Sequence, residues 1–258
     1  MSAPAISALV VAHNEEHQIA ACLDGLAFAD EIVVVLDRCT DGTRALASAR
    51  GAKLVEGAWP IEGDRRNAGI AACQGPWIFE VDADERVPAA LADELRRAAA
   101  SGVGDVFNLP IHNYVGGRWI RHGWGGLFGT NGKPAFFRKG TKTWGRQRIH
   151  PHLDISGRQG PALATGIIHH IDRDFSDMVR RFDRYTTARA ADLRESREFR
   201  PFPTLARKCF SRFLKSYLTR RGYREGGIGI LIALFAALYP LVSQMKAQFD
   251  DDASSPNA

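Results

Sequence analysis

The sequence predicts an α/β fold with a mostly parallel sheet flanked by helices, followed by a helical extension. Four short apolar runs in the N-terminal part alternate with segments of helical periodicity. A strand, helix, strand, helix order implies right-handed crossovers, which build parallel sheets. The chain becomes basic and then apolar towards its C-terminus. We therefore expect a domain over residues 1–172, a helical extension over 173–249 and a disordered tail over 250–258.

Each predicted strand is an apolar run, as expected for a strand that is buried on both faces. Gly51 follows the second predicted helix and Pro88 begins the fourth, which are favoured positions for these residues at helix ends. The Gly-, Trp- and His-rich segment 103–172 is predicted to form short strands and loops. The predicted strands are 5–12, 31–37, 52–56 and 76–82, and the predicted helices are 17–26, 43–50, 64–73 and 88–100.

Composition and cysteine usage are those of an ordinary globular protein. The chain has 258 residues, of which 45% are hydrophobic and 24% are charged. Its four cysteines have no metal-ligand spacing, so we interpret them as free thiols in a reducing compartment. The N-terminus has no signal-peptide pattern, and we expect a cytoplasmic protein.

The C-terminal part has the charge and hydropathy of a membrane-binding segment. Residues 173–224 contain 15 Lys and Arg against 6 Asp and Glu, a net charge of +9, whereas the rest of the chain sums to −4. Two amphipathic helices are predicted, at 174–198 and 204–221, and the apolar stretch 228–242 follows them. This stretch is shorter than the ~20 residues of a spanning helix and contains Pro240. We expect it to lie in the interface of an anionic membrane, with a spanning helix as the alternative and no binding of nucleic acid.

Asp82 and Asp84 follow the fourth predicted strand. One intervening residue lets a turning chain bring both carboxylates near one point, where they repel each other unless a cation lies between them. Mg²⁺ or Mn²⁺ suits such oxygen ligands and can also bind phosphate oxygens. Asp-x-Asp pairs also occur in solvated turns, and here the buried strand in front of the pair favours a metal–phosphate site.

Polar residues also follow the first two predicted strands. Asn14 and Glu15 come after the first strand, and Asp37 ends the second. We expect all three near Asp82, because ligands of parallel sheets bind beyond the carboxyl ends of the strands. Asp37 could accept a hydrogen bond from a nucleobase N–H such as uracil N3, while Glu15 could equally favour a helix N-terminus. Arg66, at a helix start, suits a diphosphate or forms a solvated basic face.

Together these segments resemble family 2 glycosyltransferases, most of all the branch that includes lipopolysaccharide-core glucosyltransferases. The resemblance implies a GT-A fold with a Rossmann-like sheet, an inverting mechanism, a nucleotide-diphospho-sugar donor (a UDP-sugar) and Mg²⁺ or Mn²⁺. It implies a lipid-linked or lipopolysaccharide-like acceptor at the inner face of the cell membrane. The segments that carry it are Ser7–Glu16, Asp30–Asp37, Thr40–Thr43, Arg66–Ala68 and Trp77–Glu85.

The resemblance also implies roles for individual residues. The nucleoside would be held by Asn14, Glu15 and Asp37. Arg66 would approach the phosphates, and Asp82 would serve the region of the ribose, the metal and the diphosphate.

Asp84 is the more direct metal ligand in this interpretation, and His170 or its neighbour His169 completes the metal shell. The chain departs from the family after Asp37. Relatives usually carry a small residue and Ser there, whereas this chain has Arg38 and Cys39.

The second departure concerns the general base that inverting transfer requires, which is commonly a carboxylate. Relatives often carry His-Glu where this chain has His150 and Pro151. We expect His150, His152 or Asp154, in that order, to replace the missing Glu. Two alternatives to a transferase stay open at this point, namely a nucleotidyltransferase that forms nucleotide-sugars and a non-catalytic nucleotide-sugar binding protein at the membrane.

Overall fold

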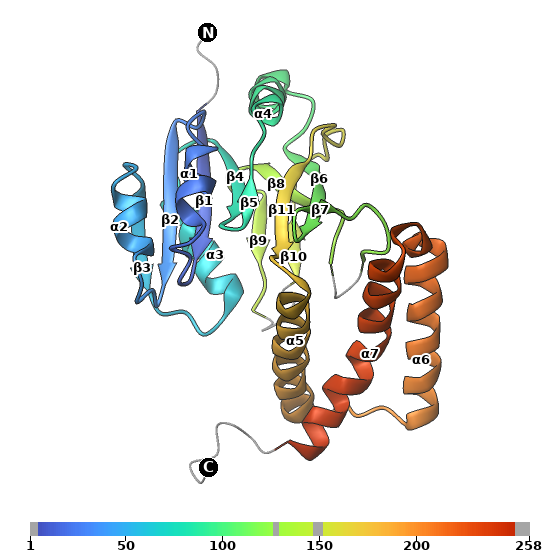
Figure 1. Cartoon of the computed structure of the whole chain (residues 1–258). Helices are drawn as coiled ribbons and strands as arrows, with labels where there is room; N and C mark the ends of the chain where they lie inside the picture. Colours follow the sequence, from blue (N-terminus) through green and yellow to red (C-terminus); the bar gives the residue numbers. More distant parts are fainter. Residues whose placement is uncertain (1–4, 126–128, 147–151, 251–258) are drawn as a thin grey trace. The chain divides into compact units, whose positions relative to one another are not determined.

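The computed structural model describes residues 5–125, 129–146 and 152–250. The chain divides into two compact units (Figure 1). The first contains residues 1–114 and 131–171, and the second contains 115–130 and 172–258. The segment 115–130 groups with the C-terminal helices, which the sequence does not indicate. The predicted disordered tail lies outside the described residues except for Asp250.

The first unit is built on one sheet with the strand order β3-β2-β1-β4-β8-β6-β11-β5. A separate antiparallel pair is formed by β9 and β10, and the short β7 (Arg118–Trp119) belongs to the second unit. The strands of the first unit are β1 (Ile6–Ala12), β2 (Glu31–Asp37), β3 (Lys53–Gly57), β4 (Trp77–Asp82), β5 (Glu85–Arg86), β6 (Val106–Val115), β8 (Gly132–Arg138), β9 (Lys142–Trp144), β10 (Leu153–Ile155) and β11 (Ile167–Asp172).

The predicted α/β fold is confirmed, and its parallel part is the block β3-β2-β1-β4. In this block the central residue Val10 pairs with Val34 of β2 and with Val81 of β4, both in parallel register. The sheet then changes direction, because β8 runs antiparallel to β4 and β6 runs antiparallel to β8. Antiparallel β5 and β11 complete the sheet. The parallel strand ends that carry the predicted site therefore adjoin strands that come much later in the chain.

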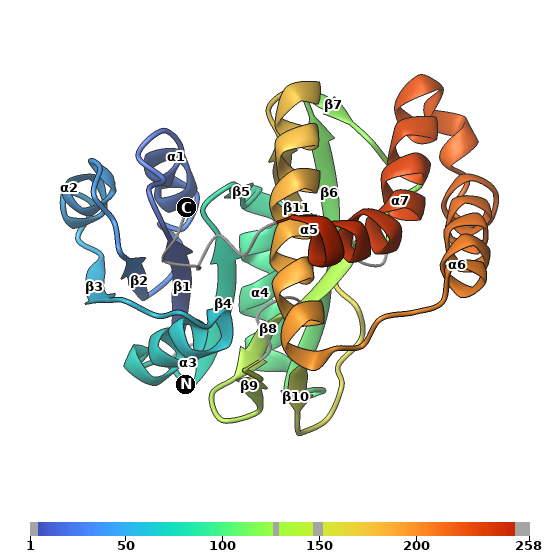
Figure 2. The ribbon, with the colours of Figure 1, turned by 90° about the horizontal axis from the view of Figure 1, so that it is seen from below.

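Helices cover both faces of the parallel block (Figure 2). Ala8 and Val10 of β1 face the core that contains α1, α2 and α4, whereas Leu9 faces the core that contains α3. Gly69 lets α3 approach closely, since a Cβ at this position would lie 2.5 Å from Leu9 Cδ1. The helices are α1 (Ile19–Asp24), α2 (Thr43–Ser48), α3 (Glu62–Ala72) and α4 (Ala89–Ser101), which confirms the four predicted helices with shifted bounds.

The second unit is helical. Asp174 caps α5 by accepting a hydrogen bond from the Asp177 N–H. The predicted helix 204–221 is corrected, because the α-helix ends at Leu214 and continues as a π-helical turn, Lys215–Thr219. The helices are α5 (Phe175–Ser196), α6 (Phe202–Leu214), a 3₁₀ turn (Gly222–Glu225) and α7 (Gly227–Phe249).

The apolar helix α7 is longer than the sequence predicted. It has 23 residues and runs through Pro240, so the expectation of a stretch too short to span was wrong. By length and composition alone, α7 is able to cross a membrane, and 44% of its most apolar window is buried. It packs against both α5 and α6. One side of α7 is therefore a core face of the second unit.

Candidate active site

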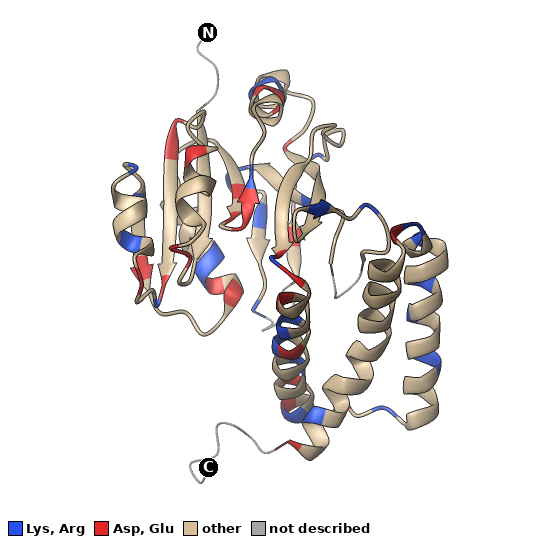
Figure 3. Cartoon of the chain, viewed as in Figure 1, with Lys and Arg blue, Asp and Glu red and all other residues tan. Residues whose placement is uncertain are grey.

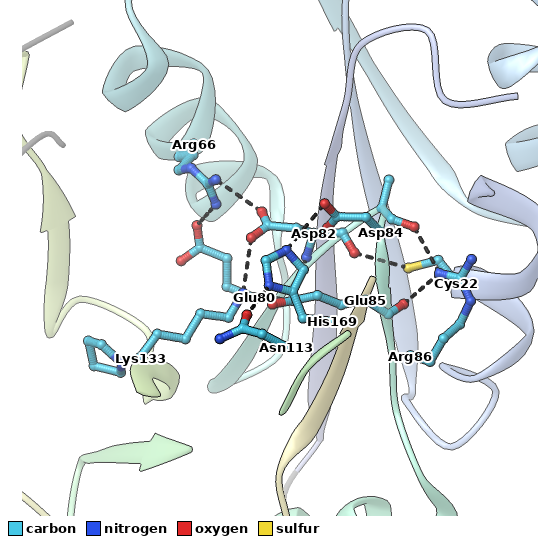
Figure 4. Close-up of polar contacts among 12 residues, drawn as sticks. Cys22, Arg66, Glu80, Asp82, Asp84, Glu85, Arg86, Asn113, Lys133 and His169 are labelled. Carbon is cyan, nitrogen blue, oxygen red and sulfur yellow. Dashed lines mark hydrogen bonds and ion pairs between the residues drawn. The ribbon is translucent and has the colours of Figure 1, made fainter. Parts of the chain in front are cut away.

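The acidic segment Asp82-Ala83-Asp84-Glu85 forms the turn between β4 and β5, at the carboxyl end of the parallel block (Figure 4). Glu85 is buried, and its Oε2 accepts a hydrogen bond of 2.8 Å from the Asp82 N–H. This bond closes the turn, so that the backbone fixes where Asp82 and Asp84 project. Burial raises the pKa of Glu85.

Each carboxylate oxygen of Asp82 contacts a cationic side chain. Its Oδ1 lies 3.0 Å from Arg66 Nη2, and its Oδ2 lies 3.1 Å from Lys133 Nζ. Lys133 also contacts Glu85 Oε2 at 2.7 Å. Desolvation raises the pKa of Asp82, but Arg66 and Lys133 outweigh this effect and hold the pKa well below its usual range. Asp82 is therefore ionised, and both of its oxygens already have partners.

Arg66 is buried among carboxylates. Besides Asp82, it donates to Glu62 Oε1 at 2.9 Å and to Glu80 Oε1 at 2.7 Å. A guanidinium with three carboxylate partners holds those groups in place. The predicted contact of Arg66 with phosphates stays a prediction, and it would require Arg66 to share donors with these carboxylates.

Glu80 is the charged residue that sequence reasoning missed in the middle of β4. It is 2% exposed and lies 2.6 Å from Lys142 Nζ, in addition to its bond with Arg66. Burial raises its pKa, but Lys142 and Arg66 lower the pKa to about 2. The sequence does contain a signal for this ion pair, because Glu80 stands inside an apolar strand, and a carboxylate buried there requires cationic partners.

Asp84 differs from Asp82 in having an unused oxygen. Its Oδ2 lies 3.3 Å from His169 Nε2, and His169 Nδ1 lies 2.8 Å from Asn113 Oδ1. Burial lowers the pKa of His169, but the contact with Asp84 outweighs it and raises the pKa. Among the described residues, Asp84 Oδ1 is buried and has no hydrogen-bond partner.

The structure places His169 at Asp84, whereas the predicted metal ligand His170 is positioned differently. The His170 N–H donates to the Asp84 carbonyl at 3.0 Å, and its ring packs 5.8 Å from that of Tyr114. Neighbouring residues of a strand point to opposite faces, so only one of the two imidazoles reaches the Asp84 carboxylate. The structure places His169 rather than His170 beside this carboxylate, and a role of either ring in binding a metal stays a prediction.

The residues fit a divalent cation that takes one protein carboxylate. In the part of the chain that the structure describes, no group of three or more His, Cys, Asp or Glu side chains is placed to hold a metal. The buried oxygen of Asp84 without a partner is the observation that fits such an ion. Mg²⁺ commonly binds one or two carboxylates together with substrate phosphates and water.

Asn14 and Glu15, which are predicted to hold the nucleoside, form hydrogen bonds between the loop after β1 and the loop after β2. Asn14 Oδ1 accepts a hydrogen bond of 2.8 Å from the Thr40 N–H. The Glu15 N–H donates to Thr43 Oγ1 at 2.7 Å, and burial raises the pKa of the Glu15 carboxyl. The loops after β1 and β2 are thus joined at the expected edge, while contact of these side chains with a nucleoside stays a prediction.

Asp37 ends β2 and is fully buried. Desolvation raises its pKa, but the hydrogen bonds from Arg38 and the Trp59 N–H outweigh it and lower the pKa. Arg38 adopts a positive φ of 51° and folds its side chain back over this carboxylate. Asp37 therefore lies where the sequence predicts, although a protein guanidinium covers it.

The predicted general bases are only partly described. His150 lies outside the described residues, as does Pro151. His152 and Asp154 are exposed, and Asp154 lies on β10, where it pairs with Thr143 of β9. Their catalytic role stays a prediction.

The family model of glycosyl transferase family 2 matches residues 7–157. The chain belongs to this family. The α/β sheet with flanking helices agrees with the GT-A fold expected for it. The matched range includes Asp37, Asp82 and Asp84, but it ends before His169, the ring that contacts Asp84.

Two relatives and one solved structure are similar to this chain. The lipopolysaccharide core biosynthesis glycosyltransferase LpsC of Rhizobium meliloti is 25% identical over 260 residues, which cover 93% of this chain and 91% of the relative. An uncharacterized glycosyltransferase of Rickettsia typhi is 25% identical over 248 residues, covering 90% and 82%. Glucosyl-3-phosphoglycerate synthase of Mycobacterium tuberculosis, crystallised with Mn²⁺ and UDP, matches at 23% identity and a TM-score of 0.37, over 44% of this chain and 45% of that one.

Proposed function

We propose that this glycosyltransferase moves a sugar, with inversion, from a nucleotide-diphospho-sugar to a hydroxyl of a lipid-linked glycan in cell-envelope polysaccharide synthesis. The buried oxygen of Asp84 that has no partner, beside a clamped Asp82, carries the proposal. Family membership supports the transferase chemistry. The likeness to LpsC over nearly the whole chain supports an acceptor of the lipopolysaccharide-core class.

In this mechanism Asp84 is the protein ligand of Mg²⁺ or Mn²⁺, which when bound supplies Lewis-acid stabilisation of the diphosphate leaving group. His169, which lies 2.8 Å from Asn113, orients the second oxygen of Asp84. Arg66 and Lys133 keep Asp82 ionised and fixed beside it. The protein thus presents a preorganised negative edge, and preorganised charge is an effective form of transition-state stabilisation.

We further propose that residues 150–154 supply the base that takes the proton of the acceptor hydroxyl. His150 remains the first choice from the sequence, followed by His152 and Asp154. Alanine at each position, compared through the pH dependence of kcat/KM, tests this assignment. Loss of the acidic limb of the profile, where protonation of the base lowers kcat/KM, identifies the base in one variant, and three unchanged profiles exclude the segment.

The second unit supports peripheral binding to the anionic inner face of the cell membrane. Ile230, Leu234 and Leu238 project from α7 at four-residue spacing and are exposed, as are Phe210 and Leu218. Exposed basic residues alternate along the chain with Phe210 and Leu218 on α6 and the turns that follow, where Figure 3 marks Lys and Arg in blue; they include Arg207, Lys215 and Arg221. The other side of α7 packs against α5 and α6, which favours a helix lying in the interface over a spanning one.

Product analysis tests the transferase activity directly. The protein is incubated with Mn²⁺, a panel of nucleotide-sugars and a truncated lipopolysaccharide acceptor. Release of free nucleoside diphosphate together with a glycosylated acceptor is the expected result. Release of pyrophosphate would instead indicate a nucleotidyltransferase, and binding without consumption of the donor would indicate a non-catalytic binding protein.

A further inference from the structure

Arg38 donates hydrogen bonds to the Asp37 carboxylate, which is the acceptor that a nucleobase N–H would need. Its Nε lies 3.0 Å from Asp37 Oδ1, and its Nη2 lies 2.9 Å from Asp37 Oδ2. The Trp59 N–H donates to the same Oδ1 at 3.0 Å, and Arg65 Nη1 donates to the same Oδ2 at 3.2 Å. A carboxylate offers about four acceptor positions. All four are therefore used by the protein itself.

The backbone holds Arg38 in this arrangement. Its φ of 51° lies in the left-handed region, which is uncommon for a residue with a long side chain. Arg38 Nη2 also donates to the Trp59 carbonyl at 3.2 Å, and His13 Nδ1 contacts the Asp37 carbonyl at 2.6 Å. A bidentate pair that is held at both ends is a rigid feature of the site.

The outer edge of the guanidinium is available to a ligand. The Arg38 side chain is 55% exposed while that of Asp37 is 1% exposed. No hydrogen bond from Arg38 Nη1 to another described residue is present. Arg38 also lines a pocket of about 120 Å³ at the ends of β2 and β3, opposite the Arg44–Glu56 pair.

We propose that Arg38 is a specificity-determining residue for the nucleobase of the donor, and that it selects against uracil. This inference rests on the proposed function. Where a bare Asp37 would accept the uracil N3–H, the Asp37–Arg38 pair presents only N–H donors. The outward Nη1 can donate to a base acceptor such as N3 of cytosine or O6 or N7 of guanine, whereas the N3–H of uracil would meet a second donor. On this inference the donor is a cytosine or guanine nucleotide-sugar, whereas the sequence predicts a UDP-sugar.

Binding of free nucleoside diphosphates tests the inference without any acceptor. Titration calorimetry with UDP, CDP and GDP in the presence of Mn²⁺ is carried out on the wild type, on Arg38→Gly and on Arg50→Ala. Glycine tolerates the left-handed backbone and uncovers Asp37. Arg50 pairs with Asp24 at 2.7 Å and does not line this pocket, so Arg50→Ala is the matched loss of an Arg side chain.

We expect the wild type to bind GDP or CDP more tightly than UDP. Arg38→Gly should shift the ratio towards UDP by about tenfold or more, because an unpaired buried acceptor discriminates strongly in favour of a matching N–H. Arg50→Ala should leave the ratio within about threefold. Arg38→Lys, which keeps the charge but cannot chelate Asp37, is expected to shift the ratio in the same direction and provides a second variant if glycine prevents folding.

Tightest binding of UDP by the wild type would overturn the inference, and so would an unchanged ratio in both Arg38 variants. These outcomes leave the proposed function intact. The failure of every nucleoside diphosphate to bind to any of the proteins would instead count against the proposed function itself. The two failures are therefore distinguishable within one experiment.

Discussion

The two units of this glycosyltransferase place charged and apolar side chains in opposite ways. In the first unit, Glu80 and Arg66 are buried and paired, and Val103 is the one large apolar side chain that is exposed among the described residues. In the second unit, eleven large apolar side chains are exposed among the described residues. Buried charge and exposed apolar surface are both unfavourable unless a partner compensates. Each unit thus departs from ordinary packing where we propose that a ligand binds.

The largest effect should come from removing the unused carboxylate oxygen. Asp84→Asn keeps the shape of the side chain but removes its charge, and we expect turnover to fall by about 10²–10³-fold while the protein still folds. Initial rates of nucleoside diphosphate release, together with circular dichroism, give the comparison. Asp24→Asn is the control, because Asp24 pairs with Arg50 at the surface. Turnover of the Asp84 variant within threefold of the wild type would refute the role of Asp84.

Breaking the buried ion network should cost stability in a way that a surface pair does not. Arg66→Met leaves Glu80 and Asp82 without their shared partner, and we expect the free energy of unfolding to fall by about 3–5 kcal/mol. Arg146→Met is the matched change, since Arg146 is 77% exposed and pairs with Asp64; we expect a loss below ~1 kcal/mol. Urea unfolding measures both. Equal losses would show that burial of the network is energetically irrelevant.

The buried network should also respond to acid. The pKa of Glu80 is lowered to about 2 in the folded protein from an ordinary value near 4.5. A lowered pKa gives a stabilisation that is present above the ordinary pKa and is lost as the pH falls through the folded value, at roughly 1.4 kcal/mol per pKa unit. Glu80→Gln should therefore flatten the decline of stability between pH 5 and pH 2. Parallel curves for the variant and the wild type would contradict the depressed pKa.

The smallest effect concerns the exposed apolar side chains of the second unit. Phe210→Ser and Leu218→Ser should each weaken binding to vesicles with anionic phospholipid by about tenfold, because each removes on the order of 1.4 kcal/mol of apolar burial. Vesicle co-sedimentation measures the affinity, and Val103→Ser in the first unit is the control. If the two changes leave the affinity for vesicles unaltered, or if the protein binds neutral and anionic vesicles equally well, the support for a membrane partner is removed.

The sequence predicts the parallel half of the fold well because its signals are local. Apolar runs and helical periodicity set β1 to β4 and the helices around them, and the residues that follow those strands reach the expected edge. The partners of these residues come from further along the chain. Antiparallel pairing that no local pattern encodes brings Lys133 on β8 and His169 on β11 to Asp82 and Asp84. Lys142 reaches Glu80 from β9, which lies outside this sheet and pairs with β10.

The segment 115–130 is a second case in which the sequence does not predict contacts between residues that are far apart in the chain. The buried carboxylate of Glu225 accepts hydrogen bonds from the N–H groups of Arg121 and His122. The two sides of this contact lie about a hundred residues apart in the chain. The sequence shows Arg38 as a departure from the family, but only the structure shows that its guanidinium covers Asp37.

Calorimetric titration of Mn²⁺ and nucleoside diphosphate into the wild type and Asp84→Asn tests the central claim most directly. We predict that the wild type binds nucleoside diphosphate at least about tenfold more tightly with Mn²⁺ than with EDTA in place of the metal. This gain in affinity should disappear in the variant. The same gain from Mn²⁺ in both proteins would contradict the assignment of Asp84 as the carboxylate that holds the cation.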